Sequence, residues 1–341
     1  MQDFNKAIDT LKKEKYKWLI TGVAGFIGSN ILEFLLLNHQ DVIGVDNFET
    51  GSKANLDFVK KSVPTSAWKK FKFHELDISD KSNIANIFKK IDFTLHQAAL
   101  GSVPRSITNP IRTNEVNISG FLNILEASKD AKVKAFIYAA SSSTYGDHKL
   151  LPKVEDIIGN PLSPYAVTKY TNELYANVFS EIYNIRTIGL RYFNVYGVNQ
   201  NPSGPYAAVI PLWISSMLKK EKVFINGDGT TSRDFCYIKD AVQANILAAI
   251  NYKNCNPSDV FNVSFGQQNT LNKLFELMKR ELNENGKEYS HDPVYRDFRL
   301  GDVKHSLADI SKAKRKIAYS PSYSLKDGLK ELILQSLHIN D

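Results

Sequence analysis

The sequence predicts an α/β protein: a doubly wound parallel sheet covered by helices on both faces, with a smaller α+β lobe towards the C-terminus. Three observations support this prediction. Strand-like and helix-like segments alternate from residue 17 to about residue 197. The strand-like segments are apolar throughout, as expected for strands buried on both faces. A glycine-rich turn joins the first strand to the first helix.

A short helix is predicted before the sheet, because Phe4, Ile8 and Leu11 have helical spacing within residues 3–14. The segments that follow are, in order, a strand and helix (17–39), strands (40–48, 71–79), a helix (83–91), a strand (92–99), a helix (114–131), a strand (134–146), a helix (164–184) and a strand (186–197). After Gly197, short strands, glycine turns and helices are mixed. We therefore divide the chain into a leader helix (1–17), a sheet domain (18–197) and a lobe (198–341) from which segments can return to the sheet.

The composition is that of an ordinary globular protein, with 341 residues, 43% hydrophobic and 23% charged. No apolar run reaches membrane-spanning length, and the N-terminus lacks the apolar core of a signal peptide. Two cysteines fit a reducing cytoplasm, and no His/Cys/Asp group has metal-ligand spacing. The net charge of +7 comes from dispersed lysines without a nucleic-acid-binding motif, so we expect a small anionic substrate and neither nucleic acid nor membrane as partner.

The glycine turn "TGVAGFIG" places Gly22, Gly25 and Gly28 at three-residue intervals between an apolar strand and an apolar helix. Such glycines permit a tight turn, a close approach of the backbone to a pyrophosphate and close helix–strand packing. Asp46 ends the second strand, where a carboxylate can accept hydrogen bonds from an adenosine ribose and would repel a 2′-phosphate. The pattern therefore predicts NAD rather than NADP. The alternative interpretation is that the three glycines serve only the packing of the helix on the strand and that Asp46 is an ordinary turn residue.

In "SPYAVTK", Ser163 and Pro164 have the positions of a helix N-cap and a first helical residue. Tyr165 and Lys169 are four residues apart and so share one face of that helix. A free tyrosine has a pKa near 10, which is too high for a base at neutral pH. The lysine, the helix N-terminus and a positively charged nicotinamide ring would each lower it. Tyr165 is therefore a candidate acid–base group.

These motifs, over Trp18 to about Leu332, resemble the extended short-chain dehydrogenase/reductase superfamily, in which a Rossmann-type domain binds NAD. The resemblance implies that Tyr165 is the catalytic base, that Lys169 also holds the nicotinamide ribose, and that Ser141 is the catalytic hydroxyl, with Ser142 as an alternative. The cofactor-binding residues implied are Gly22, Gly25, Phe26, Ile27, Gly28, Asp46, Asn47, Asp77, Ile78, Gln97, Ala98, Ala99, Tyr165 and Lys169.

Within the superfamily, sugar-nucleotide dehydratases carry an Asp-Glu pair where this chain has Ser142 and Ser143, so elimination lacks its acid. The chain is more similar to UDP-hexose 4-epimerases, which oxidise C4, let the 4-keto sugar rotate and return the hydride to the other face. The substrate-binding residues implied are Gly101, Ser102, Ser141, Ser142, Ser143, Asn194, Ala208, Val209, Trp213, Asn226, Arg233, Arg299, Asp302 and Ser306.

Ser306 lies two residues before "ADISK", where UDP-galactose epimerases that exclude N-acetyl sugars have a bulky tyrosine. Serine would leave room for an acetamido group, unless Ser306 is an ordinary polar loop residue. With Ser306, the stretch "HQAALGSVPRS" and the triple serine, the chain most resembles the subgroup of epimerases that act on UDP-GlcNAc and UDP-GalNAc, or on their uronic acids. That resemblance implies a UDP-N-acetylhexosamine 4-epimerase.

Three alternatives remain: a UDP-glucuronate 4-epimerase, a lyase that oxidises and decarboxylates UDP-glucuronate, and a non-catalytic NAD-binding regulator. The regulator is disfavoured because Tyr165 and Lys169 are both present. The resemblance also implies a homodimer formed by helices 114–130 and 164–184. The apolar residues of these helices could serve that interface or cover the sheet; they are Phe121, Leu122, Leu125, Leu174 and Phe179.

Overall fold

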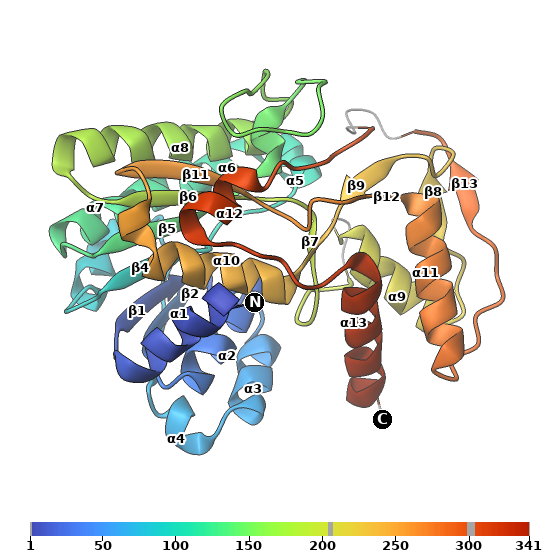
Figure 1. The fold of residues 1–341 in the computed structure, drawn as a ribbon, viewed down its shortest axis with the longest axis horizontal. Helices are drawn as coiled ribbons and strands as arrows, with labels where there is room; N and C mark the ends of the chain where they lie inside the picture. The colour runs from blue at the N-terminus through green and yellow to red at the C-terminus, as the bar shows by residue number, and fades with distance from the viewer. Residues whose placement is uncertain (1, 204–206, 299–303, 341) are drawn as a thin grey trace.

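The computed structural model of the protein describes residues 2–203, 207–298 and 304–340 (Figure 1). Within these ranges, seven parallel strands form one sheet, which confirms the predicted α/β class and doubly wound arrangement. The strands are β1 (Lys17–Thr21), β2 (Asp41–Asp46), β3 (Phe71–Glu75), β4 (Phe93–His96), β5 (Ala135–Ser141), β6 (Thr187–Tyr192) and β11 (Ser258–Val263). The sequence predicts the first six of these strands, whereas β11 comes from the C-terminal part of the chain and pairs with β6.

The strands lie in the order β11-β6-β5-β4-β1-β2-β3. The chain runs outwards from β1 to β3 and then crosses back to β4, which lies on the other side of β1. The strand order therefore reverses between β1 and β4. In open parallel sheets, the crevice at the carboxyl ends of the strands beside such a reversal is where ligands bind.

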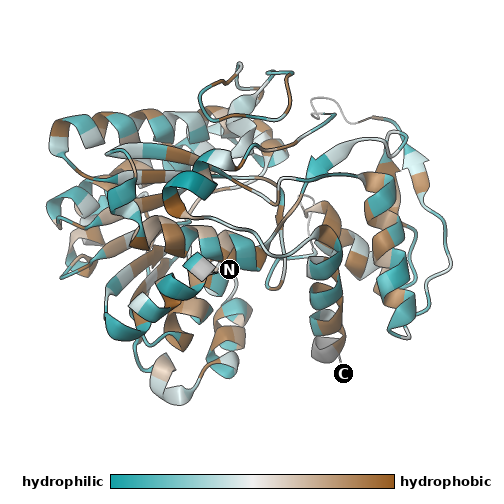
Figure 2. Ribbon diagram, viewed as in Figure 1, coloured by the Kyte–Doolittle hydropathy of each residue, from teal (hydrophilic) through white to brown (hydrophobic). Residues whose placement is uncertain are grey.

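Helices cover both faces of the sheet (Figure 1). One layer contains α1 (Gln2–Lys13), α2 (Phe26–Leu37), α3 (Lys53–Ser62) and α10 (Ile238–Ile250), and the other contains α7 (Phe121–Asp130) and α8 (Pro164–Tyr183). In Figure 2 the sheet strands are mostly brown, whereas the helices carry both brown and teal residues. This pattern places one apolar core on each side of the sheet, and Trp18 and Phe136 are buried in the two cores.

The C-terminal lobe stands beside the carboxyl ends of the strands (Figure 1). Its elements are α9 (Val209–Leu218), β8 (Phe224–Asn226), β9 (Ser232–Asp234), β10 (Cys236–Tyr237), β12 (Gln268–Thr270), α11 (Leu271–Glu284), β13 (Val294–Arg296) and α13 (Leu325–Asn340). The strand β10 pairs with β7 (Val195–Tyr196), at the end of the sheet domain. The short elements around the sheet are α4 (Thr65–Trp68), η1 (Lys81–Ile87), α5 (Val103–Thr108), α6 (Pro110–Asn114), η2 (Glu115–Gly120), η3 (Ser142–Tyr145), η4 (Tyr252–Asn254) and α12 (Ser311–Ile317).

Two predicted helices differ from the structure. Residues 83–91 were expected to form an α-helix, but a 3₁₀ helix, η1, covers Lys81–Ile87. The helix expected over 114–131 is a succession of α6, the π-helical η2 and α7. Within η2, the buried amide of Asn117 bonds to the backbone of Leu100 and to the hydroxyl of Thr168. A π-helical turn can point such a side chain away from the regular helical positions.

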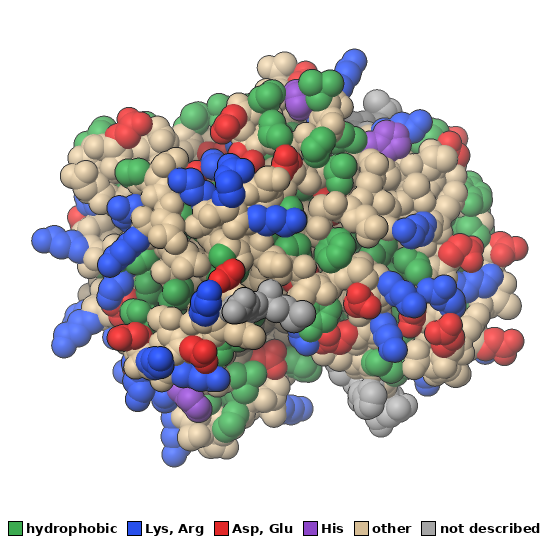
Figure 3. Space-filling model, viewed as in Figure 1, with side chains coloured by type: hydrophobic (Ala, Val, Ile, Leu, Met, Phe, Trp, Pro, Cys, Tyr) green, Lys and Arg blue, Asp and Glu red, His purple; other side chains and the backbone are tan. Residues whose placement is uncertain are grey.

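Charged side chains of both signs are spread over the face shown in Figure 3. Over the ranges that the structure covers, we find no helix whose length and apolar content would suffice to cross a membrane. In the same ranges, no three His, Cys, Asp or Glu side chains are grouped so that they could hold a metal ion.

Candidate active site

A cleft runs along the carboxyl ends of the central strands and consists of three adjoining cavities. A narrow cavity of about 40 Å³ lies beyond β2 and β3, a cavity of about 430 Å³ lies above β1, β4 and β5, and one of about 190 Å³ faces the lobe. Gly22 and Ala99 line both the first and the second, and Asn194 lines both the second and the third. We name them after the groups that the sequence predicts to bind there: the adenosine cavity, the nicotinamide cavity and the sugar cavity.

The glycine turn forms one wall of the nicotinamide cavity. Gly22 has a φ of +70°, and a Cβ atom there would lie 2.7 Å from the backbone nitrogen of Ala98. A Cβ at Gly28 would collide with the carbonyl oxygen of Gly22, so the turn tolerates only glycine at both positions. Gly25 is the N-cap of α2 and offers no side-chain cap. The free N–H groups of the first helical turn can therefore bind an anion such as a pyrophosphate.

Asp46 lines the adenosine cavity at the end of β2. Its carboxylate accepts hydrogen bonds from the backbone N–H groups of Ala24 (2.9 Å) and Phe48 (2.8 Å). Burial raises the pKa of Asp46, although these backbone donors oppose the shift. The two bonds fix the carboxylate and leave further acceptor positions for ribose hydroxyls.

These features fit NAD, because a backbone cradle for the pyrophosphate and a carboxylate for the ribose lie in one cleft. All of the predicted cofactor residues line that cleft. The adenosine cavity is lined by Gly22, Asp46, Asn47, Asp77, Ile78, Ala98 and Ala99, and the nicotinamide cavity by Gly22, Gly25, Phe26, Ile27, Gly28, Gln97, Ala99, Tyr165 and Lys169.

Tyr165 reaches the nicotinamide cavity from the first turn of α8. The Ser163 hydroxyl caps this helix by accepting a hydrogen bond from the Ala166 N–H (3.1 Å), and Pro164 begins the helix as predicted. Lys169 is buried one turn later, and its Nζ donates to the carbonyl oxygen of Ala139 (2.8 Å). The cap therefore fixes where Tyr165 enters the cleft.

The protein alone does not lower the pKa of the tyrosine. Burial raises the pKa of Tyr165, and a hydrogen bond between the Ser141 and Tyr165 side chains opposes that shift. Burial also lowers the pKa of Lys169 to about 8. Burial is thus the largest influence on Tyr165 in the protein without NAD, and the lowering of its pKa expected from Lys169, the helix N-terminus and a bound nicotinamide cation stays a prediction.

The three serines at the end of β5 line two different cavities. Ser141 lines the nicotinamide cavity together with Tyr165, whereas Ser142 and Ser143 line the sugar cavity. The Ser141 hydroxyl also accepts a hydrogen bond from the Ser143 N–H (3.1 Å), which holds it at the strand end. Of the three, Ser141 is the one with a hydrogen bond to the tyrosine.

The sugar cavity brings together residues that are far apart in the sequence. Besides Ser142 and Ser143, it is lined by Asn194, Arg233 and Ser306. Ser306 is held against the lobe by a backbone hydrogen bond to Ser232 (3.1 Å). The Asn194 amide donates to the Asp234 carbonyl oxygen (3.0 Å) at a backbone φ of 37°, which is uncommon outside glycine.

Other predicted substrate residues lie elsewhere or are not described. Gly101 lines the nicotinamide cavity, and Ser102 caps α5 beside it. Five of the described predicted residues are not among those that line the three cavities, namely Ser102, Ala208, Val209, Trp213 and Asn226. Trp213 is buried against Phe275. Arg299 and Asp302 lie outside the described residues.

The structure adds residues that the sequence patterns did not single out. Tyr192 lines the nicotinamide cavity, where its hydroxyl bonds to Gln97 (3.2 Å) and accepts from Asn245 (2.7 Å). Lys153 lines the sugar cavity and is buried, with its Nζ hydrogen-bonded to the His148 carbonyl oxygen. Tyr192 stands two residues before Asn194 in "RYFN", which is a usable signal, but nothing local marks Lys153.

The protein is similar to known epimerases along nearly its whole length. A family model described as "NAD dependent epimerase/dehydratase family" matches residues 18–264. A solved UDP-glucose 4-epimerase of Thermotoga maritima with UDP-glucose is 36% identical, with a TM-score of 0.86, and the match covers 95% of this chain and 100% of that one.

Two other solved structures hold different sugar nucleotides. UDP-N-acetylglucosamine 4-epimerase of Methanobrevibacter ruminantium, in complex with UDP-N-acetylmuramic acid, is 36% identical with a TM-score of 0.86, and the match covers 96% and 99% of the two chains. UDP-glucuronic acid 4-epimerase of Bacillus cereus, in complex with UDP-glucuronic acid and NAD, is 32% identical with a TM-score of 0.81, covering 94% and 99%. The family match and the geometry of the cleft agree, and the chain belongs to the NAD-dependent epimerase/dehydratase family.

Proposed function

We propose that this NAD-dependent UDP-sugar 4-epimerase acts on UDP-N-acetylhexosamines and interconverts UDP-GlcNAc and UDP-GalNAc. The observation that supports this substrate is Ser306, a small side chain in the wall of the sugar cavity beside Ser142 and Ser143. Small residues there leave space for an acetamido group. We further propose that the lobe formed by residues 198–341 holds the nucleotide, with Arg233 as a cation for the diphosphate.

The reaction needs a proton acceptor and a hydride acceptor at one sugar carbon. NAD, held by the glycine turn and Asp46, would supply the acceptor for the C4 hydride and the donor for its return. The Tyr165 oxygen takes the proton of the C4 hydroxyl and gives it back, and Ser141, bonded to Tyr165, orients that oxygen. Because Ser142 and Ser143 offer no carboxyl group, the chain has no acid at this place for eliminating water.

The function is tested by incubating the purified holoenzyme with UDP-GlcNAc and following the sugar signals by NMR. We expect UDP-GalNAc to accumulate until an equilibrium mixture forms, while the enzyme retains its NAD. Absence of UDP-GalNAc would contradict the proposal. Turnover of UDP-glucuronate with release of carbon dioxide would instead support the lyase alternative.

Exchanging Ser306 for tyrosine is expected to close the sugar cavity to N-acetylated sugars. We expect kcat/KM for UDP-GlcNAc to fall by at least about 100-fold, because the ring would take the place of the acetamido group, and that for UDP-glucose to change much less. Both values are measured by a coupled assay, with Ser306→Ala as the control that keeps the space open. Unchanged turnover of UDP-GlcNAc by Ser306→Tyr would refute the role of Ser306.

A second candidate substrate is the uronic acid form of the same sugar nucleotide. Lys153 supports it, because this buried side chain lines the sugar cavity and its Nζ contacts a backbone carbonyl oxygen, that of His148, rather than a carboxylate. A C6 carboxylate would provide such a partner. Comparing kcat/KM for UDP-GlcNAc and for its uronic acid decides between the two substrates.

We also propose a homodimer, formed through the outer face of α8. Leu174, Val178 and Ile182 recur on this face and are 51%, 45% and 63% exposed, respectively. The sequence leaves open whether the apolar residues of α7 and α8 form the dimer interface or cover the sheet. In the structure, Phe121 and Leu125 are buried against the sheet, whereas Leu174 is exposed. An exposed apolar stripe of this kind is typical of an interaction surface.

Placing charges on this stripe is expected to separate the protomers. The double variant Leu174→Glu/Val178→Glu should sediment as a monomer at micromolar concentration, because each glutamate would have to be desolvated in the interface. Analytical ultracentrifugation measures the mass. Leu37→Glu, an equally exposed leucine at the end of α2 on the other helix layer, is the control and should leave the dimer intact. A wild-type monomer, or a double variant that still dimerises, would contradict the proposal.

A further inference from the structure

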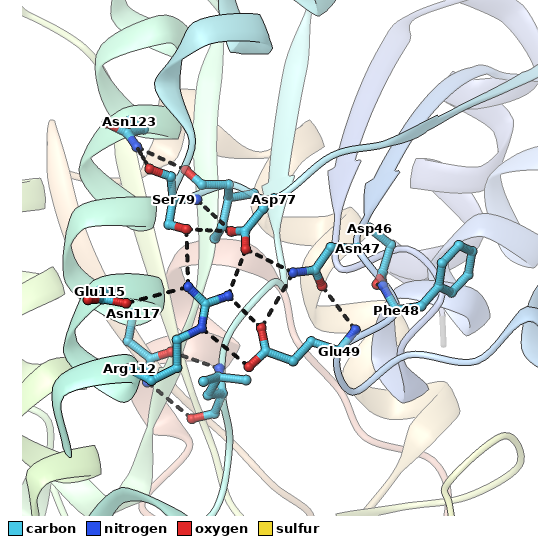
Figure 4. A network of polar contacts seen from close by, with 12 residues as sticks. Asp46, Asn47, Phe48, Glu49, Asp77, Ser79, Arg112, Glu115, Asn117 and Asn123 are labelled. Carbon is cyan, nitrogen blue, oxygen red and sulfur yellow. Dashed lines mark hydrogen bonds and ion pairs between the residues drawn. The ribbon is translucent and has the colours of Figure 1, made fainter. Parts of the chain in front are cut away.

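A network of charged side chains stands at the outer wall of the adenosine cavity, and Arg112 is at its centre (Figure 4). Arg112 lies on α6, which packs against α8 and continues into η2. Its guanidinium reaches two acidic residues from different loops: Glu49, which follows β2, and Asp77, which follows β3. The Arg112 side chain thus connects three segments that are far apart in the sequence.

The contacts of Arg112 are short and use most of its donors. Nη2 lies 2.6 Å from the Glu49 Oε2 and 2.7 Å from the Asp77 Oδ2. Nε contacts the other Glu49 oxygen at 3.4 Å, and Nη1 contacts the Ser79 hydroxyl (3.3 Å) and the Glu115 carboxylate (3.6 Å). Such a forked arrangement is one that a guanidinium can make and an ammonium group cannot.

The charges in this network stabilise one another. Hydrogen bonds to Glu49 and Asp77 raise the pKa of Arg112 against the effect of burial. At Asp77, burial opposes the shift, but hydrogen bonds from Ser79 and Arg112 lower the pKa of the carboxyl to about 2. Asp77 is therefore ionised throughout the neutral range, and its orientation is fixed by donors on two sides.

The acidic partners of Arg112 themselves line the adenosine cavity. Asn47, Glu49 and Asp77 all belong to its wall, and the Asn47 amide donates to Asp77 (3.1 Å). Arg112 is not among the lining residues, so it acts on the cavity through these side chains. The cavity that they enclose measures only about 40 Å³, compared with about 430 Å³ for the adjoining nicotinamide cavity. This end of the cleft is narrow, and the loops that Arg112 joins form part of its wall, so moving them apart would widen it.

We propose that Arg112 is a positioning residue that latches the adenosine end of the cleft. It holds the loop of Glu49 to the loop of Asp77 and thereby slows the release of NAD. Because the partners are partly exposed, with 28–35% of the side-chain surface of Arg112, Glu49 and Asp77 accessible, the latch responds to salt. The inference depends on NAD binding and not on which sugar the enzyme uses.

The test measures how fast bound NAD exchanges with radiolabelled NAD in the purified holoenzyme. We expect Arg112→Gln to exchange about five times faster than wild type at low ionic strength, the effect of losing one partly exposed ion-pair network. In the wild type, exchange should speed up when sodium chloride is raised from about 0.05 M to about 0.5 M, because salt screens the latch. In Arg112→Gln most of this salt dependence should be gone.

Two further variants separate a latch from a general loss of charge. Glu49→Gln removes a partner on the other loop, and combining it with Arg112→Gln should accelerate exchange little beyond either single change. Arg280→Gln removes an arginine from α11 whose Glu284 partner lies 3.8 Å away, and it should exchange like wild type. The proposal is overturned if Arg112→Gln exchanges at the wild-type rate, if Arg280→Gln is equally fast, or if the effects at positions 49 and 112 add in full.

Discussion

Replacement of Tyr165 by phenylalanine is expected to remove nearly all epimerase turnover while the fold and the bound NAD persist. The aromatic ring would still fill its place in the nicotinamide cavity, and Ser163 and Pro164 would still begin α8. Only the hydroxyl that bonds to Ser141 is lost. Without this proton acceptor we expect kcat to fall by about 1,000-fold, within the range of general acid–base catalysis.

The measurement compares kcat for UDP-GlcNAc, the NAD content and the melting temperature of the variant and wild type. Tyr175→Phe is a matched control, because Tyr175 lies on the same helix but is exposed on its outer face. It should leave kcat unchanged. A Tyr165→Phe enzyme that keeps wild-type kcat would show that the proton leaves the sugar by another route, and the hydride mechanism assigned here would be wrong.

Removal of the Glu173 carboxylate is expected to cost about 3–5 kcal/mol of folding free energy, because it leaves a buried charge without its partner. Glu173 lies on α8 and Arg191 on β6, and both side chains are buried. The pair is bidentate, with Nε–Oε1 at 2.9 Å and Nη2–Oε2 at 2.7 Å. Arg191 also donates to the Glu155 carbonyl oxygen (2.9 Å).

This ion pair connects α8 to strand β6 of the sheet. Glu173 follows Lys169 by one turn and Tyr165 by two, so all three residues share the inner face of α8. Losing the pair should therefore loosen the helix that carries Tyr165 and Lys169. We expect Glu173→Ala to lose activity at a lower temperature than wild type, in step with its unfolding.

Urea unfolding of the holoenzyme measures the cost, with two controls. Glu126→Ala breaks an exposed ion pair with Lys81 and should cost less than about 1 kcal/mol. Changing both Glu173 and Arg191 to methionine removes the charges together and should recover much of the lost stability. A Glu173→Ala protein as stable as wild type would mean that the pair does not hold α8 in place.

The sequence was sufficient for the parts of the fold that rest on local patterns. The apolar strands, the glycine turn and the cap at Ser163 follow from spacing and residue type, and the structure contains each of them. The seventh strand was not predicted because Ser258–Val263 lies within a mixed region, and only its pairing with β6 makes it part of the sheet. The π-helical turn was missed because its cause is a set of long-range contacts of Asn117.

The residues of the candidate site likewise fall into those that local motifs mark and those that only the fold brings to the site. Gly22, Asp46, Tyr165 and Lys169 are marked by local motifs, and all four line the cleft. Lys153 is marked by no motif and reaches the sugar cavity through pairing of its backbone with residues 307–309. Similarly, Arg112 is an ordinary charged helix residue until the fold brings Glu49 and Asp77 to it.

The place of β11 in the sheet bears on how the chain comes to be folded during synthesis. All six residues of β11 pair with β6, whose other side pairs with β5. Until residues 258–263 have left the ribosome, β6 is an open edge whose backbone groups can pair with another chain. Its neighbour α10, which packs against β5 and β6, also arrives late. The central sheet is therefore completed only by a late segment, and we expect a nascent chain to expose the β6 edge until about three quarters of it has been made.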